Sequence, residues 1–184
     1  MPKKELWQTY SAQGLPVMDG GFPAPPQEGF ASPNGVFGIA TIWFFRHVDN
    51  KLEILWQKRS QFVSHNAGFW DASAGGHINY EESPTVATVR ECREEIGTII
   101  QPEELLFVAN VDTGSSLRWD YCVDWTGKDD HFDFSDQEVE EVKWVPFAKF
   151  DDFCEKCAKN SIKEDKIRIE TLKRWLELHG HLAK

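Results

Sequence analysis

Three glutamates, Glu91, Glu94 and Glu95, are spaced so that their carboxylates would meet on one face of a helix. Residues three and four positions apart are neighbours on a helical surface. Like charges held this close repel one another, and helix formation does not require them. Hard divalent cations bind carboxylate oxygens and would remove the repulsion, and Mg²⁺ beside phosphate is the usual case. On pattern alone, a solvated acidic face partly neutralised by Arg90 and Arg93 is the commoner explanation.

The segment that carries these glutamates has the start and stop signals of a helix. Ser83 offers a capping hydroxyl, and Pro84 follows at the first helical position, where its missing N–H does no harm. Gly97 is a suitable C-terminal stop. Between them, apolar residues recur at intervals of three and four, which predicts a core-facing side made of Val86, Val89, Cys92 and Ile96.

Residues 76–98, GHINYEESPTVATVRECREEIGT, resemble the Nudix signature. That signature closes on an apolar residue, where this chain has Thr98. An average residue type occurs at roughly one position in fifteen, so a chance match at all the fixed positions is about one in a million for a chain of this length. The fixed positions are Gly76, Glu82, Arg90, Glu91, Glu94, Glu95 and Gly97.

The resemblance implies a role for each matching residue. Glu82 matches an auxiliary metal group, and Arg90 matches the arginine that orients the carboxylates through charge-assisted hydrogen bonds. The carbonyl of Gly75 lies where family members supply a backbone metal ligand. The glutamates that bind Mg²⁺ or Mn²⁺, one of which could deprotonate the attacking water, correspond to Glu91, Glu94 and Glu95.

Outside this box, ELWQTYSAQGLP, QKRS at residues 57–60 and FWDASAGGH at residues 69–77 are similar to one Nudix branch. That branch contains isopentenyl-diphosphate isomerases and isomerase-like hydrolases. Isomerases carry a catalytic cysteine directly before the box glycine, where this chain has Gly75. They also carry glutamates shortly before an Asp-Tyr pair, whereas no acid lies at residues 116–119, before Asp120 and Tyr121. The resemblance therefore favours a hydrolase over an isomerase.

Four further residues could contact a substrate. Arg59 could reach a phosphate or be a surface arginine at a strand end, and Arg118 could pair with a phosphate. His77 could hydrogen-bond to substrate, although a structural histidine is more common. Trp70 could stack on a base, although large aromatic residues near strand ends more often belong to a core. Glu138 is a candidate for an extra metal or base group, with a solvated strand start as the alternative.

The rest of the chain predicts a mixed sheet between helical layers. Residues 5–10 could be an edge strand, and a Gly- and Pro-rich arm over residues 14–35 should be irregular. Residues 36–46 and 52–58 predict a hairpin around Asp49-Asn50-Lys51. Later strands are expected at 105–111, 117–125 and 139–145, and helices at 146–159 and 163–179. With the resemblance, this pattern implies the Nudix α/β/α sandwich, an α/β (α+β) fold, in a single domain over residues 1–184.

The composition restricts the partners. A net charge of −10, from 30 acidic and 20 basic residues, argues against a general affinity for nucleic acid or anionic membranes. No apolar run reaches the length of a membrane span, and the start lacks the apolar core of a signal peptide, so a cytoplasmic location is expected. The chain could act as a homodimer. Cys154 and Cys157 form a lone CxxC, for which a structural role is favoured over zinc or redox chemistry.

Two classes of function remain. The first is a metal-dependent pyrophosphohydrolase, in which water attacks a phosphorus of a small-molecule diphosphate. The second is a non-catalytic Nudix domain that binds a diphosphate ligand. Degenerate binding modules tend to lose box acids and none is missing here, so hydrolysis is favoured. Nucleoside diphosphates, nucleotide sugars, dinucleotides and prenyl or thiamine-type diphosphates all remain open as substrates.

Overall fold

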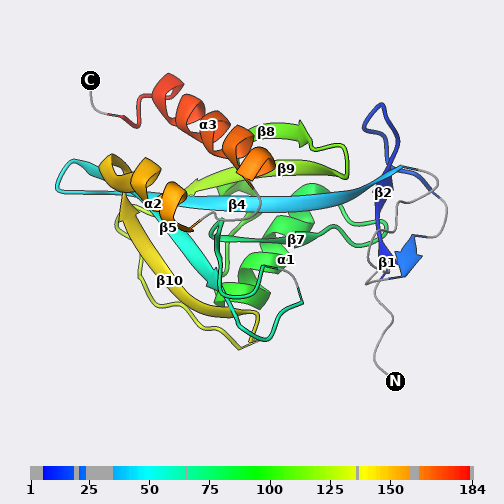
Figure 1. The fold of residues 1–184 in the computed structure, drawn as a ribbon, viewed down its shortest axis with the longest axis horizontal. Coiled ribbons are helices and arrows are strands. Elements are labelled where there is room, and N and C mark those ends of the chain that lie inside the picture. The colour runs from blue at the N-terminus through cyan, green and yellow to red at the C-terminus, as the bar shows by residue number, and fades with distance from the viewer. Residues whose placement is uncertain are drawn as a thin grey trace.

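The computed structural model describes residues 6–18, 21–23, 35–64, 66–135, 137–157 and 162–182. Its centre is an eight-stranded mixed sheet. Figure 1 shows helix α3 (Ile162–Leu178) on one side of the long strand β4 (Val36–Val48) and helix α1 (Pro84–Ile96) on the other. The predicted α/β/α sandwich is therefore confirmed. The main strands lie in the order β10 (Val139–Pro146), β5 (Lys51–Arg59), β4, β9 (Ser116–Asp124) and β8 (Leu106–Asp112).

Strand β4 organises the sheet. It forms the predicted hairpin with β5 through Asp49 and Asn50, whose φ angles of 49° and 61° are those of a type I′ turn. The pairing with β5 ends at Phe45, and the same edge of β4 then pairs antiparallel with β7 (Ala74–His77). The other edge of β4 pairs parallel with β9, which makes the sheet mixed. The hydroxyl of Ser73 bridges the point of change, because it accepts from Phe44 N at 2.9 Å and donates to Leu55 O at 2.6 Å.

Alternate residues of the central strands enter two different cores, because successive strand side chains point to opposite faces. Ile42 of β4 packs with Cys92 of α1 in one core. Trp43, the next residue, packs with Leu172 of α3 and Phe150 of α2 (Phe150–Cys157) in the other. The long run of buried residues in β4 is explained by this cover on both faces.

Helix α1 begins and ends as predicted. The Ser83 hydroxyl accepts from Val86 N at 3.2 Å, and Gly97 ends the helix with a φ of 67°. The predicted core-facing side is partly wrong, because Val86 is 53% exposed and Ala87 is buried. The side of α1 that faces the sheet includes Glu95, and a pattern of apolar residues cannot identify a buried acid.

The N-terminal segment adds short strands β1 (Leu6–Trp7), β2 (Thr9–Tyr10) and β3 (Phe22–Pro23) at one end of the sheet (Figure 1). The edge strand predicted at residues 5–10 is interrupted at Gln8, whose buried side chain donates to Val17 O at 2.9 Å and accepts from Glu81 N at 3.1 Å. Strands β6 (Trp70–Asp71) and β7 were not predicted, since they are short and β7 is rich in glycine. Residues 19–20 and 24–34 of the predicted arm lie outside the described ranges.

The C-terminal elements differ slightly from the prediction. Strand β10 continues to Pro146, and a short 3₁₀ helix, η2 (Phe147–Lys149), precedes α2, so the first long helix begins at Phe150. The 3₁₀ helix η1 (Pro102–Glu104) lies between α1 and β8. Cys154 packs against the core between α2 and the sheet, which supports a structural role. None of the helices in the described ranges is long and apolar enough to cross a membrane.

The C-terminal cap of α1 offers a test of the fold. A Cβ on Gly97 would lie 2.7 Å from Asp133 Cβ and 2.9 Å from Asp133 O, in addition to the strain of its positive φ. Gly97→Ala should therefore lower the free energy of unfolding by about 2–4 kcal/mol. Gly127→Ala is the matched control, because Gly127 has a φ of 75° and open space around it. It should lose only about 1–2 kcal/mol. Equal losses in denaturant titrations would show that Asp133 does not crowd the cap.

Candidate active site and metal centre

Arg90 holds the acidic residues of the box in place. Its Nε and Nη2 donate to the two oxygens of Glu82 at 3.0 and 2.9 Å, and Nη1 donates to Glu91 Oε1 at 2.7 Å and Glu94 Oε2 at 2.9 Å. Nη2 also donates to His77 O at 2.9 Å. A guanidinium has five N–H donors in a rigid plane, and these bonds use all of them. Arg90 therefore fixes three carboxylates relative to strand β7.

Glu95 is buried between α1 and the sheet, with 2% of its surface exposed. Its Oε2 accepts from Gly75 N at 2.8 Å and from Gln57 Nε2 at 3.3 Å. Burial raises the pKa of Glu95 well above its usual value, and the charge of Glu91 adds to the rise, whereas the Gly75 N–H and Arg59 oppose it. The protein by itself therefore disfavours the ionised form of this carboxyl group.

Glu91 and Glu94 continue the acidic cluster toward solvent. Burial raises the pKa of Glu91 to about 7, against the lowering effect of Arg90. The side chain of Glu94 is 44% exposed and lies at the rim. A Cβ on Gly76 would lie 2.3 Å from Glu91 Oε1, so glycine is what lets this carboxylate approach the backbone of β7. Several carboxylates that share one arginine, two of them largely buried, form a donor set that fits a hard divalent cation.

The acids are not arranged as a finished cation site. In the described part of the chain, no three acidic, histidine or cysteine side chains already converge as metal ligands. Glu91 Oε1 and Glu94 Oε2 are bonded to Arg90 instead. Because each carboxylate has a second oxygen, the cluster could share a cation after side-chain rotation while Arg90 keeps its bonds.

Arg59 and Glu138 lie at the same site, at adjoining ends of β5 and β10. Ser60 N donates to Glu138 O at 2.8 Å, and Arg59 is in register with Val139. Arg59 lowers the pKa of Glu95 and Glu138 raises it, so both charges lie within electrostatic reach of the acidic cluster. Both residues were candidates from the sequence, and the pairing of β5 with β10 explains why they lie together.

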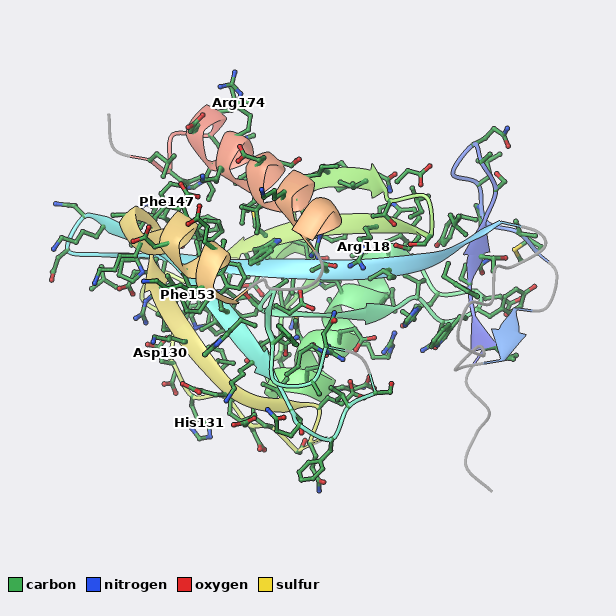
Figure 2. The ribbon with its side chains drawn as sticks, in the orientation of Figure 1. Arg118, Asp130, His131, Phe147, Phe153 and Arg174 are labelled. Carbon is green, nitrogen blue, oxygen red and sulfur yellow. The ribbon has the colours of Figure 1, made fainter. Side chains whose placement is uncertain are left out.

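His77 and Arg118 lie on the opposite face of the sheet from the acids. The Cα of Gly76 faces Glu91, so alternation turns the next side chain, that of His77, to the other face. There its ring stacks on Trp7, with centroids 3.5 Å apart and an interplanar angle of 1°. His77 and Arg118 both lie in register with Ile39 of β4, and Figure 2 shows Arg118 beside β4.

Trp70 packs away from the acidic cluster as well. Its ring contacts Phe153 of α2 edge to face, with centroids 5.3 Å apart. Figure 2 shows Phe153 on α2. This contact is the core role that was the alternative to base stacking.

Gln57 is a site residue that the sequence analysis missed. The QKRS stretch drew attention for its arginine, while the glutamine that precedes it contacts Glu95. The available signal was the polar residue itself, since Leu55 occupies the preceding inward position of β5 and is fully buried. A polar side chain in a buried strand requires a partner.

Comparison with known proteins identifies the family. The NUDIX domain family matches residues 39–166, which include every acidic residue of the site. This chain belongs to the Nudix family. It is a hydrolase that acts on phosphoric anhydride bonds, as Nudix hydrolases do. The narrower resemblance to the isomerase-like branch stays a prediction.

Solved Nudix structures share the fold at low sequence identity. The protein DR0079 of Deinococcus radiodurans is 18% identical, with 77% of this chain and 83% of that chain covered and a TM-score of 0.61. The Caenorhabditis elegans Ap4A hydrolase is 19% identical, with 77% of this chain and 98% of that chain covered and a TM-score of 0.55. A MutT/nudix family protein of Enterococcus faecalis is 17% identical, with 65% of this chain covered and a TM-score of 0.53. The match covers 47% of that chain, so this chain spans about half of that protein. No curated protein matches the sequence.

Replacing the buried acid should stabilise the metal-free Nudix protein. The folded pKa of Glu95 lies above its unfolded value of about 4.5, so stability is lost as the pH rises above that value. Glu95→Gln removes this loss and keeps an acceptor for Gly75 N. In EDTA we expect the free energy of unfolding of this variant to exceed that of the wild type by about 1–3 kcal/mol at pH 8, and by less at pH 5. Thermal unfolding at the two pH values measures both differences, and Glu94→Gln, at a half-exposed side chain, is the control. A loss of stability at pH 8 would contradict the argument.

Proposed function

We propose that this Nudix protein is a metal-dependent pyrophosphohydrolase that cleaves the diphosphate linkage of a nucleoside diphosphate or a related X-diphosphate. The observation that carries the proposal is the acidic cluster of α1, which Arg90 aligns and whose inner member, Glu95, is buried beside the sheet. Glu91, Glu94 and Glu95, with the carbonyl of Gly75, would hold Mg²⁺ or Mn²⁺. The cation would neutralise charge on the phosphate oxygens and favour the attack of water at phosphorus.

Each of the box side chains would have a separate role in the reaction. Arg90 keeps the carboxylates aligned before substrate arrives, so little reorganisation is needed during the reaction. Glu82 holds the other edge of the Arg90 guanidinium through two bonds. Glu91 and Glu94 are the candidates to accept the proton of the attacking water, since Glu94 reaches solvent and Glu91 titrates near neutral pH, with a pKa of about 7.

Arg59 is the substrate-binding residue that this proposal favours. It lies on the same side of the sheet as Gln57, two residues earlier in β5, whose amide contacts Glu95. A guanidinium there could bind a phosphate oxygen next to the cation site. His77, Arg118 and Trp70 lie toward the other face and have a weaker claim to the same substrate.

The structure also bears on the isomerase alternative. A Cβ on Gly75 would lie 2.7 Å from Ala40 O and 3.0 Å from Thr41 Cα. A cysteine could not replace this glycine unless β4 shifted. The position at which isomerases carry their thiol therefore has no room for a side chain, which supports water attack at phosphorus over proton transfer at carbon. A binding module without catalysis is less favoured because the full set of box acids is present and clamped.

Metal removal tests the proposal directly. EDTA should abolish release of phosphorylated products from a panel of nucleoside diphosphates, nucleotide sugars and dinucleotides, and Mg²⁺ or Mn²⁺ should restore it. Glu91→Gln and Glu94→Gln should each lower kcat by about 10²-fold or more, because cation and proton acceptor lose their carboxylate. Glu103→Gln, an exposed acid outside the box, is the control and should leave kcat unchanged. Full activity in chelator would refute the proposal.

A second test separates hydrolase from isomerase. With isopentenyl diphosphate and Mg²⁺ in deuterated water, the protein should incorporate no deuterium and form no dimethylallyl isomer. A general acid or base must lie within hydrogen-bonding reach of the carbon it serves, and Gly75 has no side chain to do so. NMR of the recovered diphosphate gives the answer. Isomer formation at an enzymatic rate would overturn the hydrolase assignment, whereas slow phosphate release would agree with it.

A further inference from the structure

Gln57 has an unusual environment for the last buried residue of a strand. It is 2% exposed, and its Nε2 donates to Glu95 Oε2 at 3.3 Å. Its carbonyl oxygen, Oε1, is buried and accepts no hydrogen bond from the described residues. An amide oxygen left in this state costs about 1–3 kcal/mol of stability. An apolar side chain at this position would avoid that loss, so the amide calls for an explanation beyond packing.

The partner of Gln57 suggests the explanation. Glu95 Oε2 accepts two hydrogen bonds, one from Gly75 N of β7 and one from Gln57 Nε2 of β5. Both bonds go to the same oxygen, and Glu95 Oε1 accepts none from the described residues. The carboxylate is thus held from two strands in a fixed orientation with one oxygen left over for a ligand. Partners of metal-binding carboxylates commonly act in this way.

The charge around Gln57 explains why the residue is an amide. Glu91 and Glu138 both contribute negative charge at this site. A lysine or arginine at position 57 would pair with Glu95 and compete with a cation. A neutral amide can donate to Glu95, leave its charge available and offer an acceptor to a water molecule.

We propose that Gln57 is a positioning residue of the cation site: its N–H, with that of Gly75, fixes Glu95 Oε2, and its carbonyl oxygen accepts a hydrogen bond from a water molecule in the hydrated site. The inference rests on the proposed metal-dependent function. It adds a polar residue outside the box, on β5, to the machinery on α1 and β7. Removal of the amide should weaken cation binding rather than weaken the fold.

Mn²⁺ affinity, measured from the electron paramagnetic resonance signal of the free ion, tests this role without any assay of activity. Gln57→Met keeps the length of the side chain and removes both polar atoms. We expect Mn²⁺ to bind 10- to 100-fold more weakly, about the effect of losing a partner of a metal ligand. The metal-free thermal midpoint should stay the same or rise, because the unpaired carbonyl is gone. Lys58→Gln is the matched control, since Lys58 is the next residue of β5 and pairs with Glu140 at 2.9 Å.

Gln57→Glu distinguishes positioning from packing. Glutamate keeps the shape of the side chain but cannot donate to Glu95 Oε2, and it adds charge beside Glu91, so the variant should have a lower metal-free thermal midpoint and an Mn²⁺ affinity below the wild-type value. Wild-type affinity in Gln57→Met would overturn the proposal, as would a lowered midpoint in that variant without a change in affinity. If Gln57→Met does not fold, Mn²⁺ affinity at or above the wild-type value in Gln57→Glu overturns it. Failure of the unaltered protein to bind Mn²⁺ would instead refute the metal-dependent function and this role with it.

Discussion

The candidate site depends on the way one guanidinium is saturated by its neighbours. Arg90 bonds to Glu82, Glu91, Glu94 and the backbone of β7, so the box loop, the helix and the sheet share one rigid polar centre. Without Arg90 the acids would repel one another and the loop before α1 would lose its anchor. A lysine could not replace it, because an ammonium has three donors and no planar geometry. The stability of the site and the alignment of its carboxylates therefore have the same cause.

Glu95 has the opposite effect on the stability of the metal-free fold. Arg90 is fully satisfied, whereas Glu95 is a buried acid whose ionised form the protein disfavours. A residue that lowers the stability of the metal-free fold and yet lies next to a clamped acidic cluster is best explained by binding. The glycines serve the same purpose, since Gly75 presents its N–H to Glu95 and Gly76 leaves space for Glu91.

The sequence predicted the local features of the site well and its spatial arrangement less well. The helix boundaries followed from Ser83, Pro84 and Gly97, because capping is local chemistry. The side on which His77 and Arg118 lie could not be predicted, since it depends on which strands pair with β4 and in which register. Val86 was assigned to the core for the same reason, as apolar spacing does not show which side of a helix meets the sheet. Gln57 has no sequence motif, and only its contact with Glu95 identifies it.

The change of partner along β4 has a consequence for where chemistry can occur. Strand β5 pairs with β4 only from Phe45 to Val48, and β7 pairs with β4 from Ile39 to Ile42, so β5 and β7 diverge. The Ser73 hydroxyl spans the junction between them. Glu95 reaches both divergent strands, through Gln57 on one and Gly75 on the other. The carboxylate thus occupies a gap in the ladder that continuous pairing would have closed. An uninterrupted hairpin would make a more regular sheet, but that sheet would leave no opening through which a helix could present an acid.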